Sequence, residues 1–92
     1  MKYMLTWSAP TPTYATAINK FVSTGGNPPS GVKLLGRYHA LSGSASGFIL
    51  AESSDPKGIY AWSAEWAHLI DLQIVPVIED AEAAPILQGI KR

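Results

Sequence analysis

The chain has 92 residues and no cysteine, and its seven basic and seven acidic residues give a formal net charge of zero. This length predicts a single domain over residues 1–92, with a core small enough that pairing with a second copy would add useful burial. A hydrophobic content of 47% beside 15% charged residues excludes a disordered chain. The zero charge argues against nucleic-acid binding through many phosphate contacts.

The charge is unevenly distributed along the chain. Residues 1–51 carry four basic residues and no acidic one, whereas residues 52–92 carry seven acidic and three basic residues, so the halves differ as +4 and −4. No apolar run is long enough to span a bilayer, and the first residues lack the apolar stretch of a secretory signal. A chain without cysteine needs no oxidising compartment, and we expect a cytoplasmic protein without a membrane partner.

The first part of the chain predicts a strand followed by a helix. Residues 2–8 combine apolar and β-preferring types and stop at Ala9-Pro10, which is typical of a strand. Thr11-Pro12 then joins an N-cap residue to a proline at the first helical position. Helical spacing of apolar residues predicts a helix over 12–23, which ends at Gly25-Gly26.

Two strands and a second helix are predicted next. A strand over 32–40 and a strand over 48–53 flank a small flexible loop. Asp55-Pro56 repeats the cap-and-proline signal before a second helix. The apolar face of that helix comprises Ile59, Trp62, Trp66, Leu69 and Ile70.

A fourth strand over 71–78 and a short terminal helix within 79–92 complete the pattern. Pro76 marks a bulge or an edge position in that strand, and Pro85 starts or interrupts the terminal helix. The order β-α-β-β-α-β predicts an α+β, ferredoxin-like antiparallel sheet with both main helices on one face. The expected strand order is 4-1-3-2, which places the basic second strand and the acidic fourth strand at opposite edges.

Strict alternation of side chains would divide this sheet into two faces. One set is almost entirely apolar and is predicted to lie under the helices: Tyr3, Leu5, Trp7, Val32, Leu34, Gly36, Tyr38, Ile49, Ala51, Leu72 and Ile74. The other set mixes apolar and polar types: Met4, Thr6, Lys33, Leu35, Arg37, His39, Phe48, Leu50, Glu52, Asp71, Gln73, Val75 and Val77. We expect a second copy to cover this second face around a polar cavity.

Four segments, MKYMLTWS, GVKLLGRYH, SGFILAESSDP and WSAEWAHLIDLQIVPVIED, resemble the family named domain of unknown function 3303 along nearly the whole chain. The resemblance is most specific at 36–39 and 66–77. It is looser at 41–46 and after Asp80. The family resembles the dimeric α+β barrel superfamily, in which two ferredoxin-like sheets close face to face. The resemblance implies a homodimer but no activity, because that superfamily includes cofactor-free monooxygenases, isomerases, dechlorinating and haem-handling proteins, and simple binding modules.

Arg37, His39 and Glu52 form the sharpest candidate site. Arg37 and His39 are two positions apart on one strand, and strict alternation would place Glu52 on the same face across the hairpin. Arginine can hold a carboxylate or enolate, and a neighbouring histidine can exchange a proton near neutral pH. Thr6 and Gln73 are predicted to line the same cavity. The alternative is an ion pair at a sheet edge that serves solubility or dimer register.

Other chemistry finds little support. His39 and His68 are isolated, so no metal site is predicted, and a position near a helix C-terminus explains His68. The three tryptophans are expected in the core. No cofactor is expected, because the glycine-rich pieces match neither a dinucleotide fingerprint nor a P-loop. No hydrolase triad is predicted, because Ser42, Ser44 and Ser46 lack a base and an orienting acid.

The leading functional hypothesis is a small homodimer that binds a small organic, anionic ligand near Arg37 and His39. One alternative is a cofactor-independent monooxygenase or isomerase, with His39 as base and Arg37 as anion stabiliser. Another is a structural or interaction protein whose barrel is filled by its own side chains. A cavity of about 300 Å³ or more at Arg37 would favour the first two. A two-fold dimer would also bring the basic and acidic sheet edges together.

Overall fold

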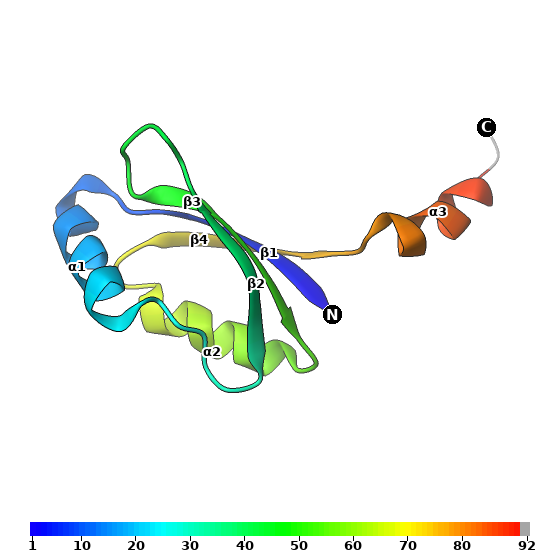
Figure 1. Ribbon diagram of the computed structural model, residues 1–92, viewed down its shortest axis with the longest axis horizontal. Coiled ribbons are helices and arrows are strands. Elements are labelled where there is room, and N and C mark those ends of the chain that lie inside the picture. Colours follow the sequence, from blue (N-terminus) through cyan, green and yellow to red (C-terminus); the bar gives the residue numbers. More distant parts are fainter. Residues whose placement is uncertain (91–92) are drawn as a thin grey trace.

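The computed structural model describes residues 1–90 (Figure 1). Its elements are, in chain order, β1 (Lys2–Ser8), a 3₁₀ turn η1 (Thr11–Thr13), α1 (Tyr14–Thr24), β2 (Val32–His39), β3 (Ser46–Ser53), α2 (Pro56–Trp66), β4 (Asp71–Val77) and α3 (Asp80–Gln88). The strands form one antiparallel sheet in the order β2-β3-β1-β4. This arrangement confirms the predicted α+β, ferredoxin-like fold and places β2 and β4 at opposite edges. Within the same residues, no helix has the length and apolarity needed to cross a membrane.

Local sequence signals set most helix ends. Asp55 caps α2 as predicted, because its Oδ1 accepts a hydrogen bond from the Lys57 backbone N–H at 2.9 Å. Gly25 ends α1 in the left-handed conformation, with φ 73°. The prediction that Thr11-Pro12 begins the first α-helix is wrong, since these residues start η1 and α1 begins only at Tyr14.

The second helix is shorter than its apolar pattern suggested. It ends at Trp66, so Leu69 and Ile70 belong to the turn before β4. Leu69 is nevertheless buried, and a residue in a turn can therefore satisfy a helical apolar pattern. Pro76 lies in β4, which is an edge strand as predicted, where a missing backbone N–H costs no sheet hydrogen bond.

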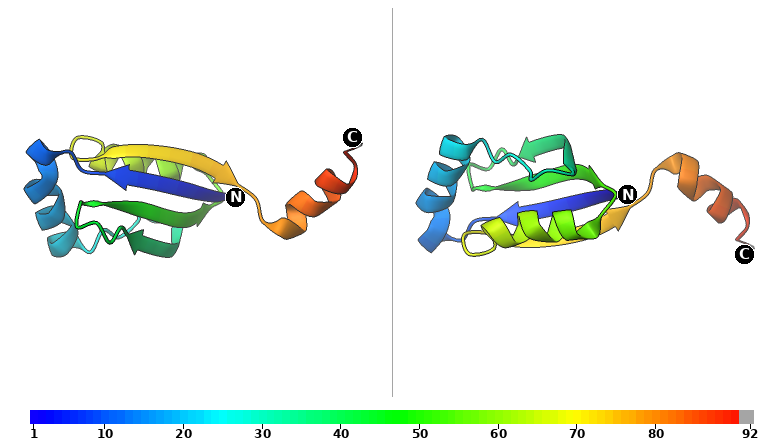
Figure 2. Two further views of the ribbon diagram at one scale, coloured as in Figure 1. Left: turned by 90° about the horizontal axis from the view of Figure 1, so that it is seen from above. Right: turned by 90° about the horizontal axis from the view of Figure 1, so that it is seen from below.

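The two main helices cover one side of the sheet unequally. α2 runs beneath the sheet and buries Ile59 and Trp62 in the core, whereas α1 crosses one end of the sheet (Figures 1 and 2). Among the residues of α1, only Ala17 is buried. The core therefore lies between α2 and the sheet. It contains Tyr3, Leu5, Val32, Ile49, Ala51, Ile59 and Trp62.

A β-bulge in β2 changes which of its side chains face the helices. Leu34 is opposite Ala51 on β3, but the next paired residue, Gly36, is opposite Leu50, so Leu35 has no partner of its own. One extra residue reverses the alternation for everything that follows it. Side chains after the bulge therefore point to the face opposite to the one that strict alternation predicts.

The bulge corrects the predicted location of Arg37 and His39. Arg37 is opposite Ile49 and His39 is opposite Gly47, which places both on the face under the helices. Glu52 is three residues from Ile49 on β3 and therefore faces the other way. The prediction that Glu52 shares a face with Arg37 and His39 is wrong for this reason.

The sheet face turned away from α1 and α2, called the outer face below, is rich in apolar side chains. Tyr38 and Phe48 stack there with ring centroids 4.9 Å apart. Strict alternation predicts Tyr38 under the helices and only Phe48 on this face, and the bulge accounts for the difference. Tyr38 is 52% and Phe48 40% exposed, and Leu35 and Val75 are exposed to a similar degree. No helix covers this face within residues 1–90 (Figure 2).

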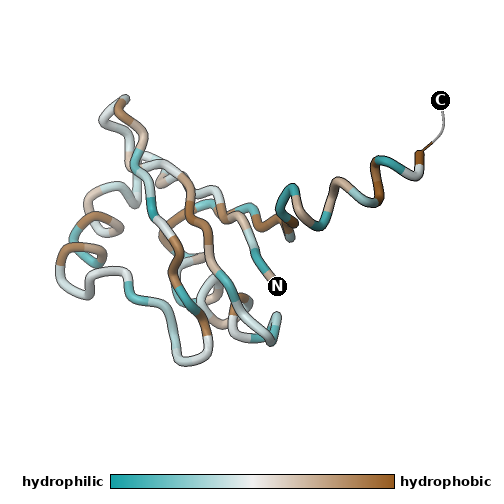
Figure 3. Tube along the Cα trace, turned by 45° about the vertical axis from the view of Figure 1, so that its right-hand side comes forward, coloured by the Kyte–Doolittle hydropathy of each residue, from teal (hydrophilic) through white to brown (hydrophobic). Residues whose placement is uncertain are grey.

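The terminal helix α3 projects from the end of β4, away from the sheet (Figures 1 and 3). The described chain consequently extends 50 Å along its longest axis and 18 Å along its shortest. α3 lies within the predicted stretch 79–92 and contains Pro85, while residues 91–92 of that stretch lie outside the described part.

Gly47 offers a test of the packing under the bulged strand. A Cβ at this position would overlap the Tyr38 carbonyl oxygen and lie 2.6 Å from the Trp7 ring. We expect Gly47→Ala to lower the free energy of unfolding by about 1–3 kcal/mol in urea denaturation, because the added methyl displaces a backbone group and a large ring. The control Ser42→Ala, in the exposed loop, should change it by less than about 0.5 kcal/mol. Equal stabilities for the two variants would contradict the close packing at Gly47.

Candidate functional site

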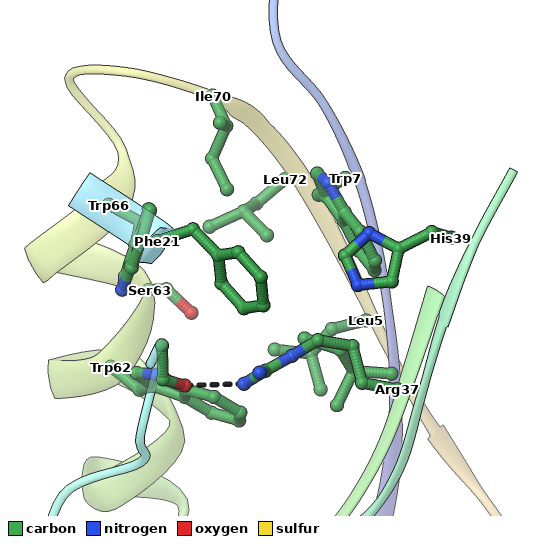
Figure 4. Close-up of a pocket in the computed structure, with 12 residues that line it drawn as sticks. Leu5, Trp7, Phe21, Arg37, His39, Trp62, Ser63, Trp66, Ile70 and Leu72 are labelled. Atoms are coloured by element: carbon green, nitrogen blue, oxygen red, sulfur yellow. Dashed lines mark hydrogen bonds between the residues drawn. The ribbon is translucent and has the colours of Figure 1, made fainter. Parts of the chain in front are cut away.

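A cleft opens between the helix-covered face of the sheet and the two main helices (Figure 4). We call it the aromatic cleft, and its lining consists of Leu5, Trp7, Phe21, Gly26, Arg37, His39, Ile49, Trp62, Ser63, Trp66, Ile70 and Leu72. It holds about 480 Å³ of empty space when its open mouth is included, of which the centre of a water-sized molecule can occupy about 70 Å³. The smaller value is well below the roughly 300 Å³ expected of a ligand cavity at Arg37, so that expectation is not met, and the aromatic cleft has room only for a compact molecule.

The aromatic cleft exists because α1 is held at the end of the sheet by polar contacts more than by burial. Three side chains donate to backbone carbonyls of neighbouring segments: Thr13 to Leu69 at 2.6 Å, Tyr14 to Gly43 at 2.9 Å and Lys20 to Glu65 at 2.7 Å. The Lys20 ammonium also lies 4.5 Å from the centroid of the Trp66 ring. These contacts fix α1 to α2 and to the loop between β2 and β3, and leave space beneath them.

Aromatic side chains make up most of the cleft walls. All three tryptophans of the chain line it, and the Phe21 ring lies between the sheet and α2 (Figure 4). Trp62 is buried in the core as predicted, and Trp7 and Trp66 are half-buried and pack against the same core. The tryptophans are therefore core residues that also form the walls of a cleft.

Arg37 joins β2 to the end of α1. One Nη donates a hydrogen bond to the Gly25 carbonyl oxygen at 3.1 Å, and the other Nη donates to the Gly26 carbonyl oxygen. The guanidinium also lies 5.1 Å from the centroid of the Phe21 ring. These carbonyls follow the last turn of α1, where the helix dipole favours a positive charge. Arg37 thus closes the helix end and forms one side of the aromatic cleft.

The Arg37 guanidinium has no carboxylate partner within residues 1–90. Partial burial strips water from the guanidinium and lowers its pKa, yet arginine stays cationic throughout the physiological pH range. The two carbonyl bonds occupy two of its five N–H donors. The surface of the aromatic cleft is almost entirely apolar, so Arg37 lies at its side and contributes little polar surface to it. An anion at this side of the cleft could meet the positive charge.

His39 lies at the rim of the aromatic cleft and is exposed. Its ring packs edge-on against Trp7, with centroids 5.3 Å apart, and lies 5.4 Å from the Phe21 ring. The structure thus brings Arg37 and His39 together but places Glu52 across the sheet from them. Glu52 cannot orient the His39 ring from there.

The other predicted site residues lie on the outer face. Glu52 sits between its cross-strand neighbours Lys2 and Lys33, and Thr6 is opposite Gln73. Thr6 and Gln73 also line a separate hollow at the β1–β4 side of the sheet. A ligand-binding role for these three residues stays a prediction, but it would be at a site other than the aromatic cleft.

Two further aspects of the prediction concern metals and missed residues. His68 is exposed in the turn after α2, and residues 1–90 contain no group of His, Asp and Glu side chains arranged to hold a metal ion. Phe21 and Gly26 are not among the predicted site residues, although both line the aromatic cleft. Gly26 has φ 59°, and a Cβ there would lie 2.8 Å from the Phe21 ring, so both the backbone conformation and the close approach of Phe21 favour glycine at this position.

Removal of the Arg37 guanidinium should loosen α1. We expect Arg37→Met to lower the free energy of unfolding by about 1–2 kcal/mol, because two charge-assisted hydrogen bonds at a half-exposed site are lost. Lys57→Met, at an exposed position of α2, is the control and should stay within about 0.5 kcal/mol of wild type. Urea denaturation measures both. An equal loss of stability in the two variants would contradict a stabilising role of the hydrogen bonds between Arg37 and the end of α1.

Comparison with known proteins supplies a family and no activity. No curated protein and no solved structure matches the chain. Residues 1–91 match the family described as Domain of unknown function (DUF3303). This match confirms the family that the sequence segments resembled, and the chain belongs to the DUF3303 family.

Proposed function

We propose that this protein binds a compact organic anion, with an apolar ring in the aromatic cleft and a carboxylate or enolate against Arg37. The observation that carries the proposal is a half-buried guanidinium without a carboxylate partner in residues 1–90, on a cleft whose other walls are mostly aromatic. A cation in such surroundings binds an anion more strongly than it would in water, because fewer water molecules compete for its donors.

The cleft walls favour a ring for the apolar part of the ligand. Trp7, Phe21 and Trp66 present aromatic surfaces to one space, and aromatic groups prefer offset or edge-on contact with other rings. The available space limits the ligand to about one ring with a short acidic substituent. Ser63 adds one polar feature, because its hydroxyl donates to the Ile59 carbonyl oxygen at 2.9 Å and its oxygen can still accept.

Binding is proposed ahead of proton-transfer chemistry. His39 is near enough to the same cleft to meet a ligand, but its ring neighbours are Trp7 and Phe21, and Glu52 lies on the other face. A general base works best when a hydrogen-bond partner holds it in position. Glu52 was expected to do this for His39, but it lies on the opposite face of the sheet. The cofactor-independent oxygenase or isomerase stays an untested alternative.

Intrinsic fluorescence can test the ligand proposal, because every tryptophan of the chain lines the aromatic cleft. We expect cyclohexanecarboxylate to bind at least about tenfold more tightly than cyclohexylmethanol, since only the carboxylate can use the Arg37 donors. Arg37→Met should abolish this preference, and Arg37→Lys, which keeps the charge, should retain part of it. Lys57→Met, at an exposed position outside the cleft, should leave both affinities unchanged.

Equal affinities for the acid and the alcohol in wild type would overturn the anion part of the proposal. A lack of response to both compounds at millimolar concentration, in fluorescence and in calorimetry, would overturn the proposal as a whole.

We further propose that a second copy of the chain covers the outer face. Contiguous exposed apolar side chains such as Tyr38, Phe48, Leu35 and Val75 are typical of interaction surfaces. A two-fold pair would bury them against themselves, in keeping with the dimeric α+β barrel superfamily that the sequence resembles.

Sedimentation equilibrium tests the pairing. We expect wild type to be a dimer at tens of micromolar and Phe48→Glu to be a monomer with an unchanged circular dichroism spectrum, because a buried carboxylate at the interface lacks a partner. Tyr60→Glu is the control, since Tyr60 is 76% exposed on α2, and should stay a dimer. A monomeric wild type would overturn the outer-face dimer.

A further inference from the structure

We propose that α3 is an exchanged arm, which in the dimer docks along the β2 edge of the partner subunit and places its acidic first turn beside the partner's Lys33. The inference rests on the outer-face dimer proposed above. It assigns a role to the one helix that lies apart from the rest of the chain (Figure 1).

α3 needs a packing partner to persist as a helix. It has nine residues, Asp80–Gln88, and Pro85 lies inside it. Isolated helices of this length are marginal in water, and an interior proline removes one of the few backbone hydrogen bonds. The helix projects from the end of β4, and neither the sheet nor α1 and α2 pack against it (Figures 1 and 2).

The exposed side of α3 has the pattern of a docking surface. Within α3, Ala83, Ile86 and Leu87 follow the i, i+3, i+4 spacing of one helix face, and Ile90 lies just beyond the end of the helix. Ile86 is 63%, Leu87 59% and Ile90 50% exposed, and hydrophobic and hydrophilic positions alternate along the α3 segment (Figure 3). An apolar stripe of this kind gains free energy when another surface covers it.

The base of the arm is fixed to its own sheet. Lys2 Nζ and Glu79 Oε2 are 2.8 Å apart, and the hydrogen bond with Glu79 raises the pKa of Lys2. This ion pair ties the segment before α3 to β1. The helix therefore leaves the sheet at its end and is available to a neighbouring molecule.

The strand register shows which part of a partner lies within reach. Val77, Lys2, Glu52 and Lys33 form one row across the sheet, through successive cross-strand pairs. A two-fold axis parallel to the strands, between two outer faces, reverses this row, so that Val77 lies over the partner's Lys33. Three extended residues span roughly 10 Å, which is about the spacing between packed sheets. Asp80 can thus reach the level of the partner's β2 edge.

The charges at the two surfaces are complementary. Asp80 and Glu82 make the first turn of α3 acidic. Lys33 is exposed on β2, and although Glu52 is its cross-strand neighbour on the same face, the two are not within ion-pair distance. Opposite charges across an interface determine how the two surfaces align more than how tightly they bind. This gives the +4 and −4 halves of the chain a specific meeting point.

Cysteine cross-linking tests the arm directly, because the chain has no cysteine of its own. Ala81→Cys protein mixed with Lys33→Cys protein should form a disulfide-linked heterodimer on mild oxidation, and this product cannot arise within one molecule. Ala81→Cys mixed with Ser42→Cys, at the opposite end of the sheet, is the control and should not cross-link. A stronger cross-link to position 42 than to position 33 would overturn the proposed docking site.

Charge reversal gives a second readout that keeps the apolar contacts. Lys33→Glu and Asp80→Lys should each raise the dimer dissociation constant by about 2- to 10-fold, since exposed pairs contribute modestly and the two-fold axis doubles each one. The double variant should recover most of the wild-type affinity. A dimer that Phe48→Glu disrupts, but that shows neither the cross-link nor the recovery, would overturn the arm and leave the outer-face dimer standing. A monomeric wild type would overturn both.

Discussion

The β-bulge at Leu35 decides which side chains of β2 line the aromatic cleft. Because Leu34 pairs with Ala51 and Gly36 with Leu50, the end of β2 turns its alternate side chains under the helices. Without this extra residue, the Arg37 guanidinium would lie on the outer face and could not reach the carbonyls that end α1. The aromatic cleft would then lack its only permanent charge, and α1 would lose its contact with β2.

The cleft also depends on a difference in how deeply the two main helices are buried. α2 contributes buried side chains to the core, whereas α1 is attached through Arg37 and a few side-chain bonds to backbone carbonyls. Polar attachments of this kind tolerate small displacements better than interdigitated apolar packing does.

Much of the fold was predictable from the sequence, because the cues were local. The element order, the Asp55 cap, the end of α1 at Gly25 and the edge position of β4 follow from turn chemistry and apolar periodicity. The site was less predictable, because one unpaired residue inverts a strand without altering its composition. Gly36 in the middle of a strand was the available hint, since glycine there often marks a bulge. Cleft walls that come from distant helices leave no local signal at all.

Gly26 carries a consequence for how the capacity of the cleft is set. The position is buried, and a Cβ there would lie 2.8 Å from the Phe21 ring and 3.2 Å from the Arg37 Nη1. The backbone at Gly26 also has φ 59°, a conformation that other residues rarely adopt. A side chain at this point would press on Phe21 and Arg37, which both line the aromatic cleft, so this glycine helps to keep the cleft open.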